Sequence, residues 1–348
     1  MEPWQKSLQH SITRVAQLAE HFPVDVPALE AVVARYPLRI TPHYLGLIRE
    51  VGDPIWRQCV PDPRELCADA LLLDPLGEEV HSPLPGLIHR YPDRAVLLVS
   101  GACAVYCRFC TRKRQVGCTS MQPGRDQLQA GLDYIARTPQ IRDVLLSGGD
   151  PLLLADEVLL ELLEGLRRIP HLDLVRIGSR VPVTLPERIT PELCALLRRF
   201  QPLYFNTHFN HPREITPESA AACARLADAG IALGNQTVLL RGVNDDPAVM
   251  VELLRGLLRI RVRPYYLHQM DLAQGTGHFR TRIETGLGIL ESLRGRVSGL
   301  AIPQYVIDTP GGRGKVPLQP DYLRTLGDRV VLRTPDGEEL IFPNSLTE

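Results

Sequence analysis

The chain has 348 residues, and its 39 Lys and Arg against 40 Asp and Glu give a formal net charge of −1. This balance argues against a general binder of nucleic acids or anionic membranes, and the lack of an 18-residue apolar run argues against a membrane span. The first 24 residues carry charges throughout and contain no apolar signal core, so we expect a cytoplasmic protein.

The beginning of the chain is predicted to be helical and rich in loops. Apolar residues recur with helical spacing over residues 4–21 and 26–35. We therefore expect a helical N-terminal extension over residues 1–90.

From residue 95 onward, strands and helices are predicted to alternate. A short apolar run predicts a buried strand over 95–101, and further strands are predicted over 143–149, 174–180, 203–209, 231–240 and 263–269. Helical spacing between and after them predicts helices over 127–136, 157–169, 191–200, 217–229, 249–260 and 283–292. This alternation indicates an α/β fold with a parallel sheet and helices outside it, a complete or partial (βα)6 barrel over residues 91–300. In such barrels the loops after the strands carry the chemistry.

The C-terminal segment, residues 301–348, has a different pattern. It is predicted to contain a strand over 304–309 and a hairpin over 330–343 around Pro335-Asp336-Gly337. A glycine-rich run ending in a lysine, Asp308-Thr309-Pro310-Gly311-Gly312-Arg313-Gly314-Lys315, follows the strand. It is not a Walker A motif, because the spacing differs and no Ser or Thr follows the lysine.

Four of the eight cysteines lie between residues 103 and 118, and thiols in a chain without an export signal are expected to stay reduced. Cys103, Cys107 and Cys110 form a C-x3-C-x2-C run after the first barrel strand. Three thiolates on one loop can bind three irons of a [4Fe–4S] cluster and leave the fourth iron open. The alternative is a structural zinc site with Cys118 as the fourth ligand. Cys59, Cys67, Cys194 and Cys223 receive no role from the sequence.

The cysteine run, with aromatic Phe109 before the third cysteine, resembles the motif of the radical S-adenosylmethionine (SAM) enzymes. The resemblance implies a [4Fe–4S] cluster on the three cysteines and SAM bound at the open iron. The end of the second strand is similar to the glycine motif with which this family binds SAM: Ser147, Gly148, Gly149 and Asp150. Glycines allow the backbone to approach a ligand closely. Gln236, in the fifth strand, is a further candidate contact for SAM.

The glycine-rich run resembles a segment of the lysine 2,3-aminomutases, a family within the radical SAM enzymes. In that family the lysine at the position of Lys315 binds pyridoxal 5′-phosphate (PLP) covalently. Residues 88–115 contain six Lys or Arg and one acidic residue, an excess that suggests an anion site or a solvated basic face. By resemblance, Arg90, Tyr91 and Arg94 bind the PLP phosphate.

Substrate contacts are implied in the same way. Arg112 matches the arginine that binds the substrate carboxylate, and Asp74 matches an acid that pairs with this arginine. Asp271 and Asp308 match two aspartates that bind the ε-ammonium of lysine. The implied activity is that of an isomerase, a lysine 2,3-aminomutase that converts L-lysine to (R)-β-lysine and needs an external one-electron reductant.

The sequence also departs from the metabolic lysine aminomutases. Those enzymes carry a zinc-binding C-terminal extension and a partner cysteine after the fifth strand, where this chain has Asp246 and no cysteine follows Cys223. In this respect it resembles a shorter form of the family that supplies β-lysine for modification of elongation factor P. That likeness implies a functional link to elongation factor P and its lysyl-ligase.

Three alternatives share part of these features. A zinc-stapled binding module explains the cysteines but not the Lys315 loop. A conventional PLP enzyme explains Lys315 but not the cysteine run. A radical aminomutase for another amino acid, without a role in elongation factor P modification, would use the same cofactors. His208 and His211 are interpreted as pocket-lining or structural residues rather than metal ligands.

Overall fold

The computed structural model describes residues 2–67, 71–118, 122–327 and 329–344. Its centre is a nine-stranded sheet whose strands lie side by side in chain order. Seven consecutive strands run parallel: β2 (Arg94–Ser100), β3 (Asp143–Gly148), β4 (Leu174–Gly178), β5 (Leu203–Thr207), β6 (Ala232–Leu239), β7 (Arg263–Gln269) and β8 (Gln304–Asp308). The predicted α/β partial barrel is confirmed, and its parallel order extends one strand further than the six expected.

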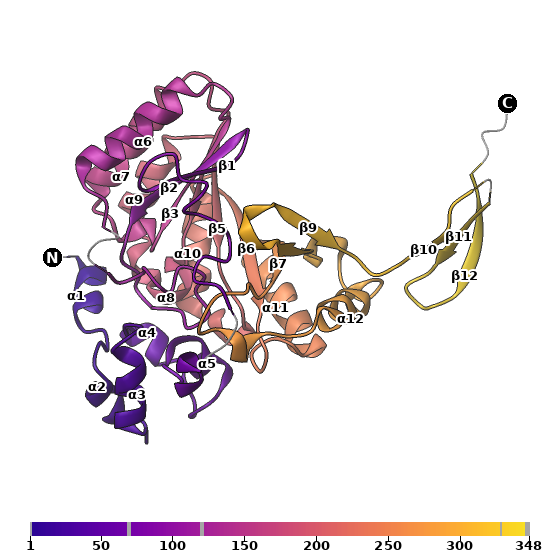
Figure 1. The fold of residues 1–348 in the computed structure, drawn as a ribbon, viewed down its shortest axis with the longest axis horizontal. Helices are drawn as coiled ribbons and strands as arrows, with labels where there is room; N and C mark the ends of the chain where they lie inside the picture. The colour runs from indigo at the N-terminus through magenta and orange to yellow at the C-terminus, as the bar shows by residue number, and fades with distance from the viewer. Residues whose placement is uncertain (1, 68–70, 119–121, 328, 345–348) are drawn as a thin grey trace.

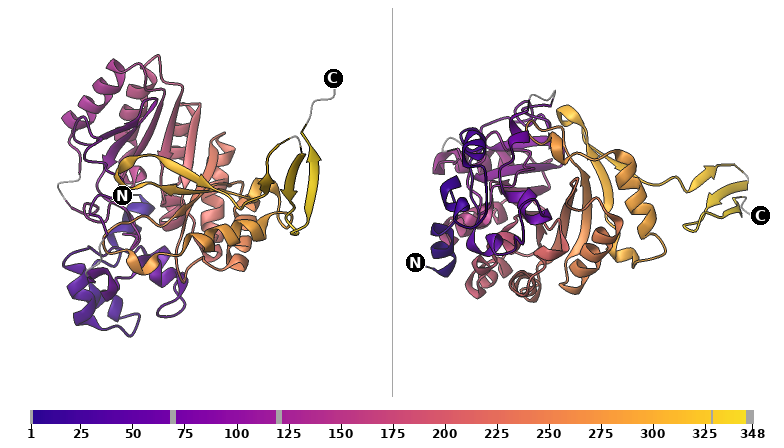
Figure 2. Two further views of the ribbon diagram at one scale, coloured as in Figure 1. Left: turned by 45° about the vertical axis from the view of Figure 1, so that its right-hand side comes forward. Right: turned by 90° about the horizontal axis from the view of Figure 1, so that it is seen from below.

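One antiparallel strand lies at each edge of this sheet, and neither was predicted. At one edge β1 (Leu87–Tyr91) forms a hairpin with β2, and at the other β9 (Lys315–Leu318) returns alongside β8. The sheet curves but does not close (Figure 2). It is therefore an open barrel whose edges are formed by β1 and β9.

Helices connect the parallel strands and lie against the outside of the curved sheet (Figures 1 and 2): α6 (Arg125–Arg137), α7 (Asp156–Arg167), α8 (Val181–Thr184), α9 (Pro191–Arg198), α10 (Pro217–Asp228), α11 (Pro247–Arg259) and α12 (Ile283–Leu293). Three of them begin with the same device, a capping side chain followed by proline. Thr190, Thr216 and Asp246 each accept a hydrogen bond from a backbone N–H of the first turn.

Burial alternates along the strands, as expected for a sheet with one face against helices. In β6 one face of the strand is partly exposed, at Gly234, Gln236 and Val238. On its other face Leu233 and Leu239 are buried. The apolar core therefore lies between the sheet and the helices. The inner face of the barrel remains accessible.

The N-terminal extension consists of short helices: α1 (Pro3–Gln9), α2 (Val15–Ala19), α3 (Val26–Val33), α4 (Pro42–Leu45) and α5 (Pro54–Cys59). The helical spacing noted over residues 4–21 corresponds to two helices, α1 and α2, with a break between them. Ile12 leaves the helix to exchange two backbone hydrogen bonds with Ile40, at 2.8 and 3.0 Å. A long-range pairing of this kind overrides the local helical spacing.

The C-terminal part contains a second, three-stranded antiparallel sheet of β10 (Leu323–Thr325), β11 (Arg329–Arg333) and β12 (Glu339–Pro343). The predicted hairpin over 330–343 is confirmed, with Val330 opposite Phe342. Figure 1 shows this small sheet standing apart from the barrel. The division into residues 1–90, 91–300 and 301–348 stays a prediction, and residues 345–348 lie outside the described part.

No helix among the described residues is both long enough and apolar enough to span a bilayer.

Candidate active site

The segment that carries Cys103, Cys107 and Cys110, called the cysteine loop, directly follows β2. Cys103, Cys107 and Cys110 are each partly buried. Burial raises the pKa of Cys103 well above its ordinary value and that of Cys110 to about 11. Thiols in such surroundings become thiolates only when a positive charge compensates for burial. Bound iron supplies that charge, so the donor set suits a metal cluster.

The fourth cysteine of the region is placed differently. Cys118 is exposed at the end of the loop. In the described part of the chain, no three His, Cys, Asp or Glu side chains are grouped to hold a single metal ion. A cluster binds each cysteine at a different iron, so its ligands stand further apart than those of one zinc ion.

The glycine motif after β3 packs directly against the start of the cysteine loop. Gly148 has φ of +126°, and a Cβ there would lie 2.3 Å from the Ser100 carbonyl oxygen. A Cβ on Gly149 would lie 2.4 Å from the Ala102 carbonyl oxygen. The backbone N–H of Asp150 donates to that same carbonyl at 2.7 Å. Only glycine permits this approach, which places the two loops side by side.

Asp150 has a structural task of its own. Its buried carboxylate accepts hydrogen bonds from the Ser179 hydroxyl at 2.7 Å and from the backbone N–H groups of Arg180 and Leu152 at 2.8 and 3.0 Å. Because this carboxylate is already occupied, the backbone of the glycine motif would be the part that binds SAM. Gln236 lies further around the barrel, on the accessible face of β6.

Lys315, at the start of β9, contacts the hairpin of β1 and β2, although the two lie at opposite edges of the sheet. The hydroxyl of Tyr91 accepts the backbone N–H of Lys315 at 3.1 Å and Nη2 of Arg90 at 3.2 Å. The guanidinium groups of Arg90 and Arg94 lie 4.7 and 4.3 Å from the Tyr91 ring centroid. The gap of the open barrel is thus bridged at the predicted PLP residues.

Asp308 faces the amine of Lys315. Its carboxylate forms an ion pair with Lys315 Nζ, lies 3.3 Å from Nδ1 of His268 and 3.4 Å from Nη2 of Arg90. Burial alone would raise the pKa of Asp308, but the hydrogen bond from His268 and the charge of Lys315 lower it below its usual range. Asp308 is therefore ionised. Sequence reasoning missed His268, which carries no motif of its own.

The glycine-rich run forms a tight turn between β8 and β9. Gly312 has φ of +73°, and a Cβ on it would lie 2.6 Å from the Leu76 carbonyl oxygen. The hydroxyl of Thr309 donates to the Gly314 carbonyl at 2.7 Å and closes the turn. Lys315 begins β9 directly opposite Asp308 in the strand register, which fixes the ion pair. A loop without the return strand β9 was predicted at this point.

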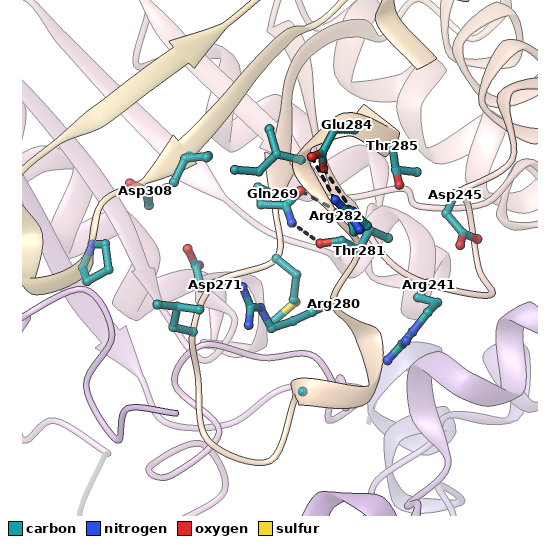
Figure 3. Close-up of a pocket in the computed structure, with 16 residues that line it drawn as sticks. Arg241, Asp245, Gln269, Asp271, Arg280, Thr281, Arg282, Glu284, Thr285 and Asp308 are labelled. Carbon is teal, nitrogen blue, oxygen red and sulfur yellow. Dashed lines mark hydrogen bonds and ion pairs between the residues drawn. The ribbon is translucent and has the colours of Figure 1, made fainter. Parts of the chain in front are cut away.

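The two predicted ammonium-binding aspartates line one cavity of about 760 Å³. Figure 3 shows Asp271 and Asp308 toward one end of it and Arg241 and Asp245 toward the other. Burial and the nearby charge of Asp308 raise the pKa of Asp271 to about 7. Two carboxylates that share a buried site in this way favour a cation as their ligand.

Arg112 was predicted to pair with Asp74, and this prediction is wrong. Nε and Nη2 of Arg112 instead bind the Glu78 carboxylate, at distances of 2.6 to 3.0 Å. Asp74 lies 3.6 Å from Arg114 and accepts the backbone N–H of Glu79 at 2.9 Å. The remaining Nη1 of Arg112 faces the Ser147 hydroxyl at 3.3 Å, beside the glycine motif. A direct role of Asp74 in substrate binding stays a prediction.

His208 and His211 have the structural contacts that were predicted as one alternative. Nε2 of His208 lies 3.1 Å from Oδ1 of Asn210, and burial lowers the pKa of His208 well below its ordinary value. Nδ1 of His211 accepts the backbone N–H of Arg213 at 3.2 Å.

Comparison with known proteins identifies the family. Residues 97–254 match the model of the radical SAM superfamily, and residues 290–344 match the lysine-2,3-aminomutase model. The L-lysine 2,3-aminomutases of Clostridium subterminale and Fusobacterium nucleatum are 49% and 48% identical to this chain; each alignment covers 96% of this chain, and 82% and 80% of the relative. The chain belongs to the lysine 2,3-aminomutase family of radical SAM enzymes. The glutamate 2,3-aminomutase of Clostridioides difficile is 47% identical over 89% of this chain and 74% of its own.

Membership in the lysine 2,3-aminomutase family makes this protein an isomerase and implies three cofactors, a [4Fe–4S] cluster, SAM and PLP. The residues present fit them. Three thiols lie on one loop, and bound iron would balance the negative charge of their thiolates, so they suit the cluster. Arg90 and Arg94, stacked on Tyr91 beside Lys315, suit a dianionic phosphate next to an amine.

The contact between Arg112 and Glu78 gives a first testable expectation for this aminomutase. If Arg112 binds the substrate carboxylate, as the sequence predicts, Glu78→Gln should loosen this arginine, and we expect KM for the amino-acid substrate to rise about tenfold. Glu79→Gln removes a neighbouring carboxylate that contacts Arg114 rather than Arg112 and serves as the matched control, with KM expected to change less than twofold. Steady-state kinetics of both variants measure the difference. Equal effects of the two substitutions would contradict the assigned pairing.

Proposed function

We propose that this protein converts L-lysine to β-lysine by moving the amino group from C2 to C3, with PLP bound at Lys315. The observation that carries the proposal is the position of Asp271 and Asp308 in one cavity, with the amine of Lys315 beside Asp308. An ammonium group is the complement of two buried carboxylates. A substrate with a cationic side chain fits this site better than a neutral or acidic one.

The chain's own residues divide the work among the strand ends. Cys103, Cys107 and Cys110 would hold the cluster, while Ser147–Asp150 and Gln236 would hold SAM. Arg90, Tyr91, Arg94 and Lys315 would hold PLP. When bound, SAM and the reduced cluster supply a radical that abstracts hydrogen, and PLP carries the amino group. Glu78 orients Arg112, which would bind the carboxylate of the substrate. This carboxylate lies at the opposite end of lysine from the ε-ammonium.

Asp308 has two successive partners in this proposal. In the structure it neutralises the ammonium of Lys315, and His268 and Arg90 hold its carboxylate in place. With PLP held on Lys315, the carboxylate would no longer face the ammonium of this lysine and would keep Arg90 and His268 as partners. The ε-ammonium of lysine then restores the charge balance. With Asp271 nearby, Arg90 alone leaves an excess of buried negative charge, so the site favours a substrate that supplies a second cation.

Asp271 makes the use of lysine dependent on pH. Its pKa is about 7 in the free protein, and the groups around it are Asp308, Lys315, Arg90 and Glu78. Binding of an ammonium requires the ionised carboxylate, so lysine binding is strong above pH 7 and weakens as the pH falls below it.

We expect kcat/KM for lysine to fall by up to about tenfold per pH unit below pH 7. Asp271→Asn removes this titration, and its profile should be flat over the same range. A pH–rate profile of both proteins, at saturating SAM and reductant, measures it. The same acid limb in both would assign the titration to another group.

A glutamate 2,3-aminomutase is the second candidate, because a relative with that name is 47% identical to this chain. The substrate side chain of that reaction is an anion, which Asp271 and Asp308 would repel. Lysine and glutamate assayed in parallel decide between the two. A turnover of glutamate that equals or exceeds that of lysine would overturn the choice of substrate.

We further propose that the product is (R)-β-lysine and serves the modification of elongation factor P by its lysyl-ligase. The support is the resemblance noted at Asp246, where the metabolic enzymes carry a cysteine. Chiral chromatography of the product tests the isomer. Mass spectrometry of elongation factor P, from cells with and without this protein, tests the use: its loss should remove a lysyl mass from the factor.

A further inference from the structure

Arg180 is a buried arginine that contacts the cysteine loop and has no part in the site described so far. It follows β4, and its backbone N–H donates to Asp150 of the glycine motif at 2.8 Å. Its side chain is 8% exposed. Arg180 thus stands between the loop that would hold the cluster and the loop that would hold SAM.

The guanidinium group reaches in three directions. Nη1 donates to Sγ of Cys107 at 2.7 Å. Nε donates to the carbonyl oxygen of His208 at 3.1 Å. Nη2 is held by three acceptors, the Tyr44 hydroxyl at 3.0 Å, Gln58 Oε1 at 2.6 Å and Glu214 Oε1 at 2.7 Å. Because Tyr44 and Gln58 belong to the N-terminal extension, these short helices help to aim Nη1 at the sulfur.

The pair of Arg180 and Glu214 is more than a packing contact. Glu214 is fully buried, and its second oxygen accepts the backbone N–H groups of Asn210 and His211 at 2.6 and 2.8 Å. Removing two charges from water is costly, and apolar residues of similar size often fill such a space at no loss of stability. Arg180 is therefore held in place by an ion pair whose burial is unfavourable, and one of its N–H groups donates to the Cys107 sulfur. This arrangement points to a function at that sulfur.

We propose that Arg180 is a positioning residue for the iron–sulfur cluster: it fixes the Cys107 thiolate and makes the cluster easier to reduce. The inference rests on the cluster assigned to Cys103, Cys107 and Cys110. Reduction transfers one electron from the external reductant to the cluster, with no bond broken. The added negative charge is shared by the sulfur ligands, and an N–H donor to one of them stabilises the reduced form.

The test compares variants of the reconstituted full chain. Arg180→Lys keeps the charge opposite Glu214 but loses the fork that reaches both partners. The double variant Arg180→Gln with Glu214→Gln removes both charges together and covers the case in which the single variant does not fold. Arg188→Lys is the matched control, because Arg188 is also buried in the same segment but binds Leu152, Leu154 and Asp156 rather than the cysteine loop.

Two readouts are taken without substrate: iron bound per chain, and the midpoint potential from a redox titration followed by electron paramagnetic resonance. We expect the reduction equilibrium in the Arg180 variants to weaken about tenfold, a midpoint lower by about 59 mV, with no change in Arg188→Lys. A folded Arg180 variant that takes up little iron, beside a control that is fully loaded, also supports the proposal. Iron content and potential equal to those of the unsubstituted protein, or a higher potential, overturn it. Failure of the unsubstituted protein to bind iron would instead refute the cluster assignment.

Discussion

Lys315→Arg is expected to abolish covalent attachment of PLP and to lower β-lysine formation by roughly 10³-fold or more, the scale of loss when a covalent catalytic residue is removed. The arginine keeps a positive charge beside Asp308, so the ion pair and the turn between β8 and β9 should survive. The loss would then report on the missing amine rather than on a damaged fold.

The amino-acid sequence makes attachment simple to locate. The chain contains three lysines, Lys6, Lys113 and Lys315. Lys6 is exposed on α1, and Lys113 is buried against Glu65. Borohydride reduction of the PLP-loaded protein, followed by peptide mass spectrometry, should find PLP on Lys315. Lys6→Arg is the matched control and should keep both attachment and activity. PLP trapped on Lys6 or Lys113 in the unsubstituted protein would contradict the assignment.

Asp271→Asn is expected to lower kcat/KM for lysine by about 10²-fold, because one of the two carboxylates facing the substrate ammonium is lost. Asp308→Asn should lower it further, since Asp308 also faces Lys315 and is the carboxylate that stays ionised. Both variants should still cleave SAM when reduced, because neither residue is among those assigned to the cluster or to SAM.

Asp245→Asn is the matched control for this pair. Asp245 lines the same cavity away from the two aspartates (Figure 3) and accepts the backbone N–H of Gly242 at 2.8 Å. Its loss should change lysine kinetics less than twofold. Steady-state kinetics of the three variants, with PLP loading measured for each, test the expectation. Unchanged lysine turnover in both Asp271→Asn and Asp308→Asn would refute lysine as the substrate.

The parts of the fold that follow from local pattern were predictable. The alternation of strand-like and helical segments predicted the parallel strands, and the loops after the strands had to meet at one end of the barrel. The approach of Asp271 and Asp308, one after β7 and one at the end of β8, follows from that rule. The proximity of the cysteine loop to the glycine motif follows from it as well.

The edge strands were missed for physical reasons. β1 carries His89 and Arg90, so it lacks the apolar run of a buried strand. β9 contains Pro317, which counts against a central strand but is tolerated at the edge of a sheet. The contact between Tyr91 and Lys315, which depends on both edges, was therefore suggested by family resemblance and not by the pattern of either segment.

The partner of Arg112 could not be read from charge alone. Three acids, Asp74, Glu78 and Glu79, lie in one short segment, and each could pair with a nearby arginine. The fold of that segment selects Glu78 for Arg112 and leaves Asp74 and Glu79 to Arg114. Arg180 was missed for a similar reason, because its partners come from four separate parts of the chain.

The most direct test of the account is an anaerobic assay for β-lysine. The protein is reconstituted with iron and sulfide, supplied with PLP, SAM, dithionite and L-lysine, and the product is measured by mass spectrometry. We expect β-lysine only when SAM, PLP and the reductant are all present. A brown protein that cleaves SAM yet forms no β-lysine would contradict the assigned substrate. Product formed in air without SAM would contradict the radical mechanism itself.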